Sequence, residues 1–142
     1  MSSENETLEL MRRRVDPEPD DKILDGYVLN RWGVIMNGDI EFSVHPKGEN
    51  YPICKVKICC IGGWWYEATG VNLCQSGRSS PLTMHYGYDS KEAAMRAATD
   101  DILEYCQRGS DVTREQKQCA IIIQAIKDYW QGETGPEQLS LF

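Results

Sequence analysis

The sequence predicts an α+β domain, in which an antiparallel β-meander of four to five strands is followed by two amphipathic helices packed on one face of the sheet. Two observations indicate this class. From residue 27 to residue 88, apolar and polar side chains alternate in short segments separated by turn-forming residues, which is typical of half-buried strands. From residue 90 to residue 132, apolar residues recur instead at the three- and four-residue spacing of helices.

The composition is that of one ordinary globular domain. The chain has 142 residues, of which 41% are hydrophobic and 26% are charged, and its net charge is −7. An acidic protein of this kind does not accumulate on nucleic acid without a local basic patch, so we expect direct nucleic-acid binding to be absent. Long-range attraction favours basic proteins, or protein surfaces that normally receive DNA.

The first twenty residues contain no apolar core of a secretory signal, and no segment has the length of a membrane span. We therefore expect a cytoplasmic protein with reduced, mostly buried thiols. A zinc site is the weaker interpretation of the cysteines, because no CxxC pair is present, and we expect no metal and no cofactor. That alternative site would use Cys54, Cys60, Cys74 and His85.

Composition shifts divide the chain into three parts. Residues 1–25 are predicted to form a flexible polar arm, because Pro17 and Pro19 end any helix that begins before them. Residues 26–132 form the single α+β domain. Residues 133–142 are predicted to be a flexible tail, because "ETGPEQ" has no apolar periodicity and contains both Gly and Pro.

The first strands lie in "WGVIMNGDIEFSV", where Asn37-Gly38 is typical of a tight type I′ hairpin turn. In the following strand, "ICKVKICCI", the alternation places Cys54, Val56, Ile58 and Cys60 on one face and Lys55, Lys57 and Cys59 on the other. Gly62-Gly63 forms a second hairpin turn before the strand "WWYEATGVNL". A polar loop, "QSGRSSP", then precedes a last strand, "LTMHYGY".

Two helices follow the sheet. Asp89 and Ser90 are candidate caps of the first helix, and Gly109 is its expected terminator. The second helix is predicted to begin at Asp111 or Thr113 and to end at Gly132. Each helix carries an apolar stripe. The stripes consist of Met95, Ala98, Ile102 and Cys106, and of Cys119, Ile122, Ile123, Ile126 and Trp130.

The run Trp64, Trp65 and Tyr66 forms a secondary candidate surface. Alternation along a strand places Trp65 on the face opposite to Trp64 and Tyr66, so at least one large aromatic side chain is expected to be partly exposed. Such a side chain can anchor a protein partner or stack on a base. The alternative is that the helices cover one face and a loop or the arm covers the other.

The strongest functional signal is the stretch "QLSLF" at positions 138–142. It resembles the pentapeptide by which bacterial DNA polymerases and other replication and repair proteins bind the DNA sliding clamp: Gln, Leu, a small or acidic residue, Leu and Phe. The resemblance implies that Leu141 and Phe142 fill a hydrophobic pocket of the clamp. Gln138 would make polar contacts in the neighbouring subsite beside Leu139, and Ser140 would be the tolerant position. The alternative is that this apolar stretch folds back on its own domain.

We therefore expect a non-enzymatic accessory protein that docks on the clamp, of a type familiar from phages and mobile elements. His45 and His85 have no nucleophile placed beside them in the sequence, and no catalytic motif is present. Two other functions remain open. One is a single-stranded nucleic-acid binder that uses Trp64 and Tyr66. The other is a DNA-mimicking inhibitor of a host defence or restriction nuclease, which would use Asp16, Glu18, Asp20, Asp21, Asp100, Asp101 and Glu104.

Overall fold

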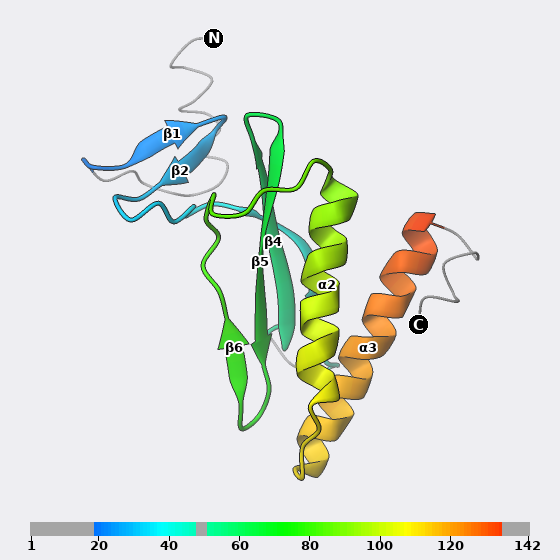
Figure 1. Cartoon of the computed structure of the whole chain (residues 1–142). Helices are drawn as coiled ribbons and strands as arrows, with labels where there is room; N and C mark the ends of the chain where they lie inside the picture. The colour runs from blue at the N-terminus through cyan, green and yellow to red at the C-terminus, as the bar shows by residue number, and fades with distance from the viewer. Residues whose placement is uncertain (1–18, 48–50, 135–142) are drawn as a thin grey trace.

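The computed structural model describes residues 19–47 and 51–134 (Figure 1). It confirms the α+β class, with two antiparallel sheets followed by two helices. The larger sheet is a meander in the order β3-β4-β5-β6, and β1 pairs with β2 in a separate sheet. The elements are β1 (Lys22–Leu24), β2 (Tyr27–Leu29), β3 (Asp39–Val44), β4 (Cys54–Ile61), β5 (Trp64–Asn72), β6 (Gly77–Ser79), α2 (Lys91–Gln107) and α3 (Thr113–Thr134).

The hairpin formed by β4 and β5 is the centre of the larger sheet. Its pairing is continuous from Cys54 opposite Val71 to Ile61 opposite Trp64. The two-residue turn has positive φ at both positions, 62° at Gly62 and 85° at Gly63, which non-glycine residues rarely adopt. The hairpin predicted from Gly62-Gly63 is therefore confirmed.

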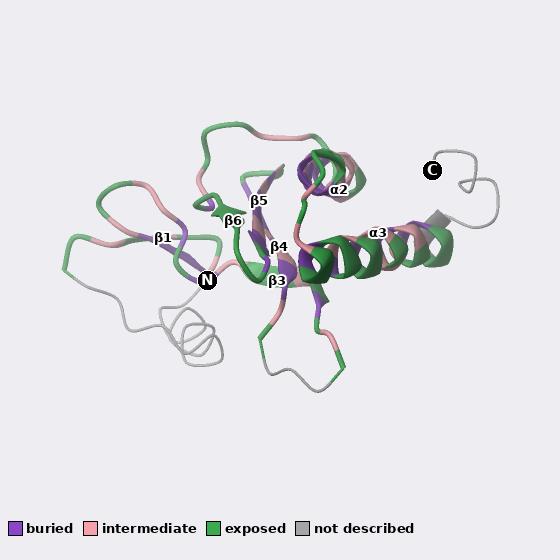
Figure 2. Ribbon diagram, turned by 90° about the horizontal axis from the view of Figure 1, so that it is seen from below, coloured by how far each residue is buried: buried purple, intermediate pink, exposed green. Residues whose placement is uncertain are grey.

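Both helices cover one face of this sheet (Figures 1 and 2). Their apolar stripes pack against the inward-facing residues of β3, β4 and β5 and form the main core. The alternation predicted for β4 is confirmed, because Cys54, Val56 and Ile58 belong to this core. From the helices, the core receives Met95, Ala98, Ile102, Tyr105, Cys106, Ile122, Ile126 and Trp130.

The helix ends follow the capping rules with one exception. Ser90 is the N-cap of α2, and its side chain accepts a hydrogen bond from the backbone N–H of Ala93. Gly109 follows the helix with φ of 87°, as expected of a terminating glycine. The prediction that α3 ends at Gly132 is wrong. The helix continues through this residue to Thr134, because an exposed glycine lowers helix stability without breaking the hydrogen-bond pattern.

A second core lies on the other face of the sheet, under the β1–β2 hairpin. It contains Tyr27, Leu29, Ile35, Cys59, Ile61, Tyr66, Ala68 and Leu82. The hairpin turn is Asp25-Gly26, with φ of 52° and 85°. The folded region thus includes β1, which lies within residues 1–25, the segment that the sequence assigns to the arm. Asp-Gly is a strong hairpin signal, but the charged residues around it hid the strand.

The type I′ hairpin turn predicted at Asn37-Gly38 is wrong, because neither residue has positive φ; a turn of another kind occurs at Met36 and Asn37. The amide of Asn37 is buried and is used instead to hold β2. Its Oδ1 accepts a hydrogen bond of 2.7 Å from the backbone N–H of Val28, and its Nδ2 donates one of 3.2 Å to the carbonyl of Gly26. Gly38 is closely packed, since a Cβ atom there would meet Cδ2 of the buried Leu82 and this side chain would have to shift.

The positions predicted for the last strand and for the loop before it are also wrong. The fourth strand of the larger sheet is β6, which lies within the predicted loop "QSGRSSP". It pairs with Gly70, Val71 and Asn72 of β5. The segment "LTMHYGY" forms only isolated bridges, from Thr83 to Val34 and from Tyr88 to Trp65. All three β6 residues are exposed, so this edge strand needs no apolar alternation and leaves no pattern in the sequence.

The hydrogen bonds of Asn37 give a test of how the hairpin is attached. The change Asn37→Ala leaves the buried N–H of Val28 without its acceptor, so we expect the free energy of unfolding to fall by about 1–3 kcal/mol. Urea unfolding followed by tryptophan fluorescence measures this loss. The control Gln124→Ala, on the exposed surface of α3, should change it by less than about 0.5 kcal/mol. Equal stability of both variants would contradict the assignment.

Candidate functional site

The predicted clamp-binding residues, Gln138–Phe142, lie outside the described residues. What the structure does show is the point from which they extend. The end of α3 projects beyond the rest of the domain (Figure 2), and Gln131 and Gly132 are exposed there. The last firm anchor is Trp130, which is 1% exposed and whose Nε1 donates a hydrogen bond of 3.1 Å to Oγ1 of Thr99. The described chain therefore ends at the periphery of the domain, one turn after a buried tryptophan.

The aromatic run is divided between three environments. Trp64 is 52% exposed, and Tyr66 is only 7% exposed in the core under the hairpin. Trp65 lies on the opposite face, half-buried against the helix-side core. The backbone of Gly87 closes over the first face, because a Cβ atom there would lie 3.1 Å from the ring of Tyr66. Tyr66 is thus not available to stack on a base, and Trp64 is the exposed member of the run.

The acidic side chains proposed for a DNA-mimicking surface are partly engaged within the domain. Asp101 forms an ion pair with Arg78 and accepts a hydrogen bond of 3.1 Å from Oγ1 of Thr69. Asp20 lies 3.9 Å from Arg31. Such pairs reduce the negative potential that a DNA mimic would present. Asp100 and Glu104 are exposed, whereas Asp16 and Glu18 lie outside the described residues.

The cysteines are all free thiols. Burial raises the pKa of Cys54 to about 12, and burial together with a hydrogen bond to Cys119 raises the pKa of Cys106 to about 12. These thiols therefore stay protonated at neutral pH, and a protonated thiol is a poor metal ligand and nucleophile. In the described ranges, no three His, Cys, Asp or Glu side chains come together in a way that could hold a metal ion.

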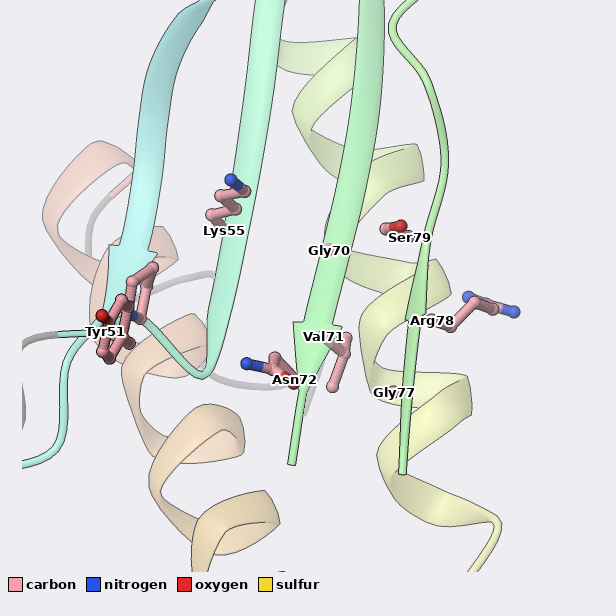
Figure 3. A pocket seen from close by; sticks show the side chains of 9 residues that line it. Tyr51, Lys55, Gly70, Val71, Asn72, Gly77, Arg78 and Ser79 are labelled. Carbon is pink, nitrogen blue, oxygen red and sulfur yellow. The ribbon is translucent and has the colours of Figure 1, made fainter. Parts of the chain in front are cut away.

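A trough lies on the sheet face opposite the helices, where the β1–β2 hairpin no longer covers it. We call it the β5 trough, because it follows Ala68, Gly70 and Asn72 of that strand. Two hollows of about 440 and 290 Å³ make it up, and they share Lys55, Gly70 and Ser79. Figure 3 looks into the first hollow with the helices behind the sheet.

The two sides of the trough differ in chemistry. On the β4 side stand Lys55 and Lys57, and on the other side stand β6 and the segment 80–82. Neither lysine side chain has an ion pair or hydrogen bond with a described residue. Burial and the charge of Lys55 lower the pKa of Lys57 from its ordinary value. Arg78 also borders the trough, but its guanidinium points away to Asp101.

The comparisons with known proteins give no assignment for this chain: no protein-family model, no curated protein and no solved structure matches it. Within the described residues, neither helix combines the length and the apolar character needed to cross a bilayer. The candidate sites therefore depend on the residues themselves.

The sequence already indicated part of the trough, because the alternation of β4 placed Lys55 and Lys57 on the face away from the core. The signal that was missed is the run of small residues opposite them. Ala68 and Gly70 alternate on the same face of β5, so they leave the space beside the lysines empty. The sequence does not show which half of this face the hairpin covers.

Glu67 gives a test of the contact between β5 and α2. Burial, and then the charge of Asp101, raise the pKa of this carboxyl. The folded protein therefore holds this proton more tightly than the unfolded chain, and stability falls as the pH rises from the unfolded pKa through the folded one. The change Glu67→Gln removes this cost, so we expect the Tm at pH 7 to rise by roughly 1–4 °C.

At pH 4, where Glu67 is largely protonated in the folded protein, the difference in Tm between this variant and the unaltered protein should shrink toward zero. Thermal unfolding followed by circular dichroism at both pH values measures it. Glu104→Gln, the same substitution at an exposed position of α2, is the matched control. A stabilisation by Glu67→Gln that is equal at both pH values would contradict the electrostatic explanation.

Proposed function

We propose that this protein is an accessory factor that binds the bacterial DNA sliding clamp through Gln138–Phe142 and tethers its folded domain there. The observation that carries the proposal is the agreement of all five positions with the clamp-binding pentapeptide. An extended peptide of this kind gains affinity by placing adjacent apolar side chains in a groove, while an amide makes polar contacts at the rim. Short peptides bound in this way reach micromolar affinity, roughly −7 to −8 kcal/mol.

The exit of the chain from the domain supports the proposal. Trp130 fixes the end of α3, and the helix projects away from the sheet before the described residues end at Thr134. Gly135-Pro136 follows directly, and this pair does not favour continuation of the helix. A peptide attached at such a projecting end can enter a groove of the clamp without bringing the domain into collision with it.

The described part of the main core does not depend on the tail. The helix stripes and the inward-facing strand residues already bury one another, and Ile122, Ile126 and Trp130 are at most 1% exposed. Leu139, Leu141 and Phe142 are therefore not needed to complete the described interior. Transfer of these side chains into a partner's pocket would provide their burial, at roughly 1.5–3 kcal/mol for each large apolar side chain.

The test is a titration of purified bacterial sliding clamp with the full chain, measured by surface plasmon resonance. We expect micromolar binding that Leu141→Ala and Phe142→Ala each weaken at least about tenfold, because each removes apolar contacts worth more than 1.4 kcal/mol. Ser140→Ala is the matched control, since this position tolerates substitution, and its affinity should stay within about twofold.

A synthetic peptide of residues 132–142 should compete with the full chain for the clamp. Circular dichroism of the variants excludes unfolding as the cause of any loss. Binding that is absent, or that persists unchanged in both apolar variants, would refute the proposal. A DNA-mimicking inhibitor would behave differently, because removal of residues 138–142 would leave its activity intact.

A further inference from the structure

We propose that the β5 trough binds an extended acidic peptide segment of a partner protein. This inference goes beyond clamp docking and does not rest on it. The trough is built by β4, β5 and β6 on the face opposite the helices, whereas the clamp-binding residues follow α3.

The shape of the trough suits an extended chain. From Ala68 to Asn72 it runs along four residue steps of β5, or about 13 Å at the rise of a strand. This length accommodates four or five residues of an extended peptide. The floor is low because Gly70 has no side chain, and the stem of Lys55 lies beside the space left by it. A Cβ atom at Gly70 would lie 3.5 Å from Cγ and 3.7 Å from Cε of Lys55.

The charge of the trough is opposite to that of the chain. Although the chain has a net charge of −7, no Asp or Glu occurs among the described residues that line the two hollows. Lys55 and Lys57 stand two residues apart on one side, about 6.6 Å along the strand. That distance equals the spacing of alternate carboxylates in an extended peptide. A carboxylate beside each ammonium would supply the partner that the domain does not provide.

Large side chains at the two ends of the trough favour a ligand that also carries apolar residues. Tyr51 borders the first hollow and is 78% exposed, and Met36 borders the second and is 50% exposed. Large exposed side chains at the two ends can cover apolar residues of a ligand and exclude water from the charged centre. The favoured ligand therefore has alternating acidic residues at its centre and apolar residues on either side.

A peptide fits these features better than a nucleic acid. Tight binding to a phosphate backbone usually needs several neutralised phosphates, and the net charge of −7 repels a polyanion. Two lysines match two carboxylates of a short segment. The ring of Tyr66 is buried, so on this face of the sheet β5 does not present two exposed aromatic rings on which bases could stack.

The experiment measures fluorescence anisotropy of a labelled octapeptide with the full chain. Aspartate alternates with serine at the centre of this peptide, and leucine stands at both ends. We expect saturable binding that weakens between 0.1 and 0.5 M NaCl as the Debye length falls below about 5 Å. A peptide with asparagine in place of each aspartate should bind at least about tenfold more weakly, equivalent to 1.4 kcal/mol.

Two independent variants locate the site. Lys55→Gln/Lys57→Gln removes both charges, and Gly70→Val fills the floor without strain, because Gly70 does not have positive φ. Each should weaken binding at least about tenfold. The matched control Lys117→Gln/Lys127→Gln changes the net charge equally on α3 and should leave the affinity within about twofold.

Circular dichroism establishes that every variant is folded. Absence of binding, or equal binding by the Gly70 variant and the unaltered protein, would overturn the proposal. So would tighter binding of inorganic phosphate or of a ten-nucleotide thymidine oligomer than of the acidic peptide. A chain truncated after Glu137 should bind the peptide normally, so loss of clamp binding and loss of peptide binding are separate results.

Discussion

The continuous pairing of β4 with β5 is the interaction on which the rest of the structure depends. From Cys54 opposite Val71 to Ile61 opposite Trp64, each residue has a fixed neighbour, and therefore a fixed face. A shift by one residue would move Val56 and Ile58 out of the helix-side core and place the two lysines inside it. Val56 is completely buried, so moving its side chain into water would cost free energy and make that shift unfavourable. The register thus decides which side chains the helices cover and which remain for other partners.

The two faces of this hairpin are completed differently. Two helices cover one face along its length, because their stripes supply large residues such as Met95, Ile122 and Trp130. The small β1–β2 sheet has only six paired residues, so it covers only the part of the other face around Cys59 and Tyr66. Beyond Ala68 the cover ends. The β5 trough is therefore a consequence of a short hairpin on a long strand pair, and its charge follows from the outward positions of β4.

Sequence reasoning succeeded where burial imposes a clear period. The inward residues of β4 and both helix stripes are as predicted, because each element packs one face against a large core. It failed where tertiary contacts compete with local preference. At Asn37-Gly38 the asparagine amide bonds the backbone of β2 and no type I′ hairpin turn forms, and the exposed β6 is held by backbone pairing and by the ion pair of Arg78 with Asp101. The sequence indicated the lysines of the trough but not its extent, since its boundary depends on how far a separate hairpin reaches across the sheet.

The described end of α3 and the β5 trough lie on opposite sides of the domain, and this arrangement has a consequence for the two proposals. The described chain ends with α3 on the helix side, while the trough opens on the other face of the sheet. In the proposed function the clamp would attach through the segment that follows α3, whereas Lys55 and Lys57 stand on the other face of the sheet. A partner of the trough that is itself attached to the clamp would be held near Lys55 and Lys57, and linkage of this kind raises the effective concentration and so strengthens weak binding. A small protein with two modest sites can in this way bring a second factor to the clamp without a large interface on either side.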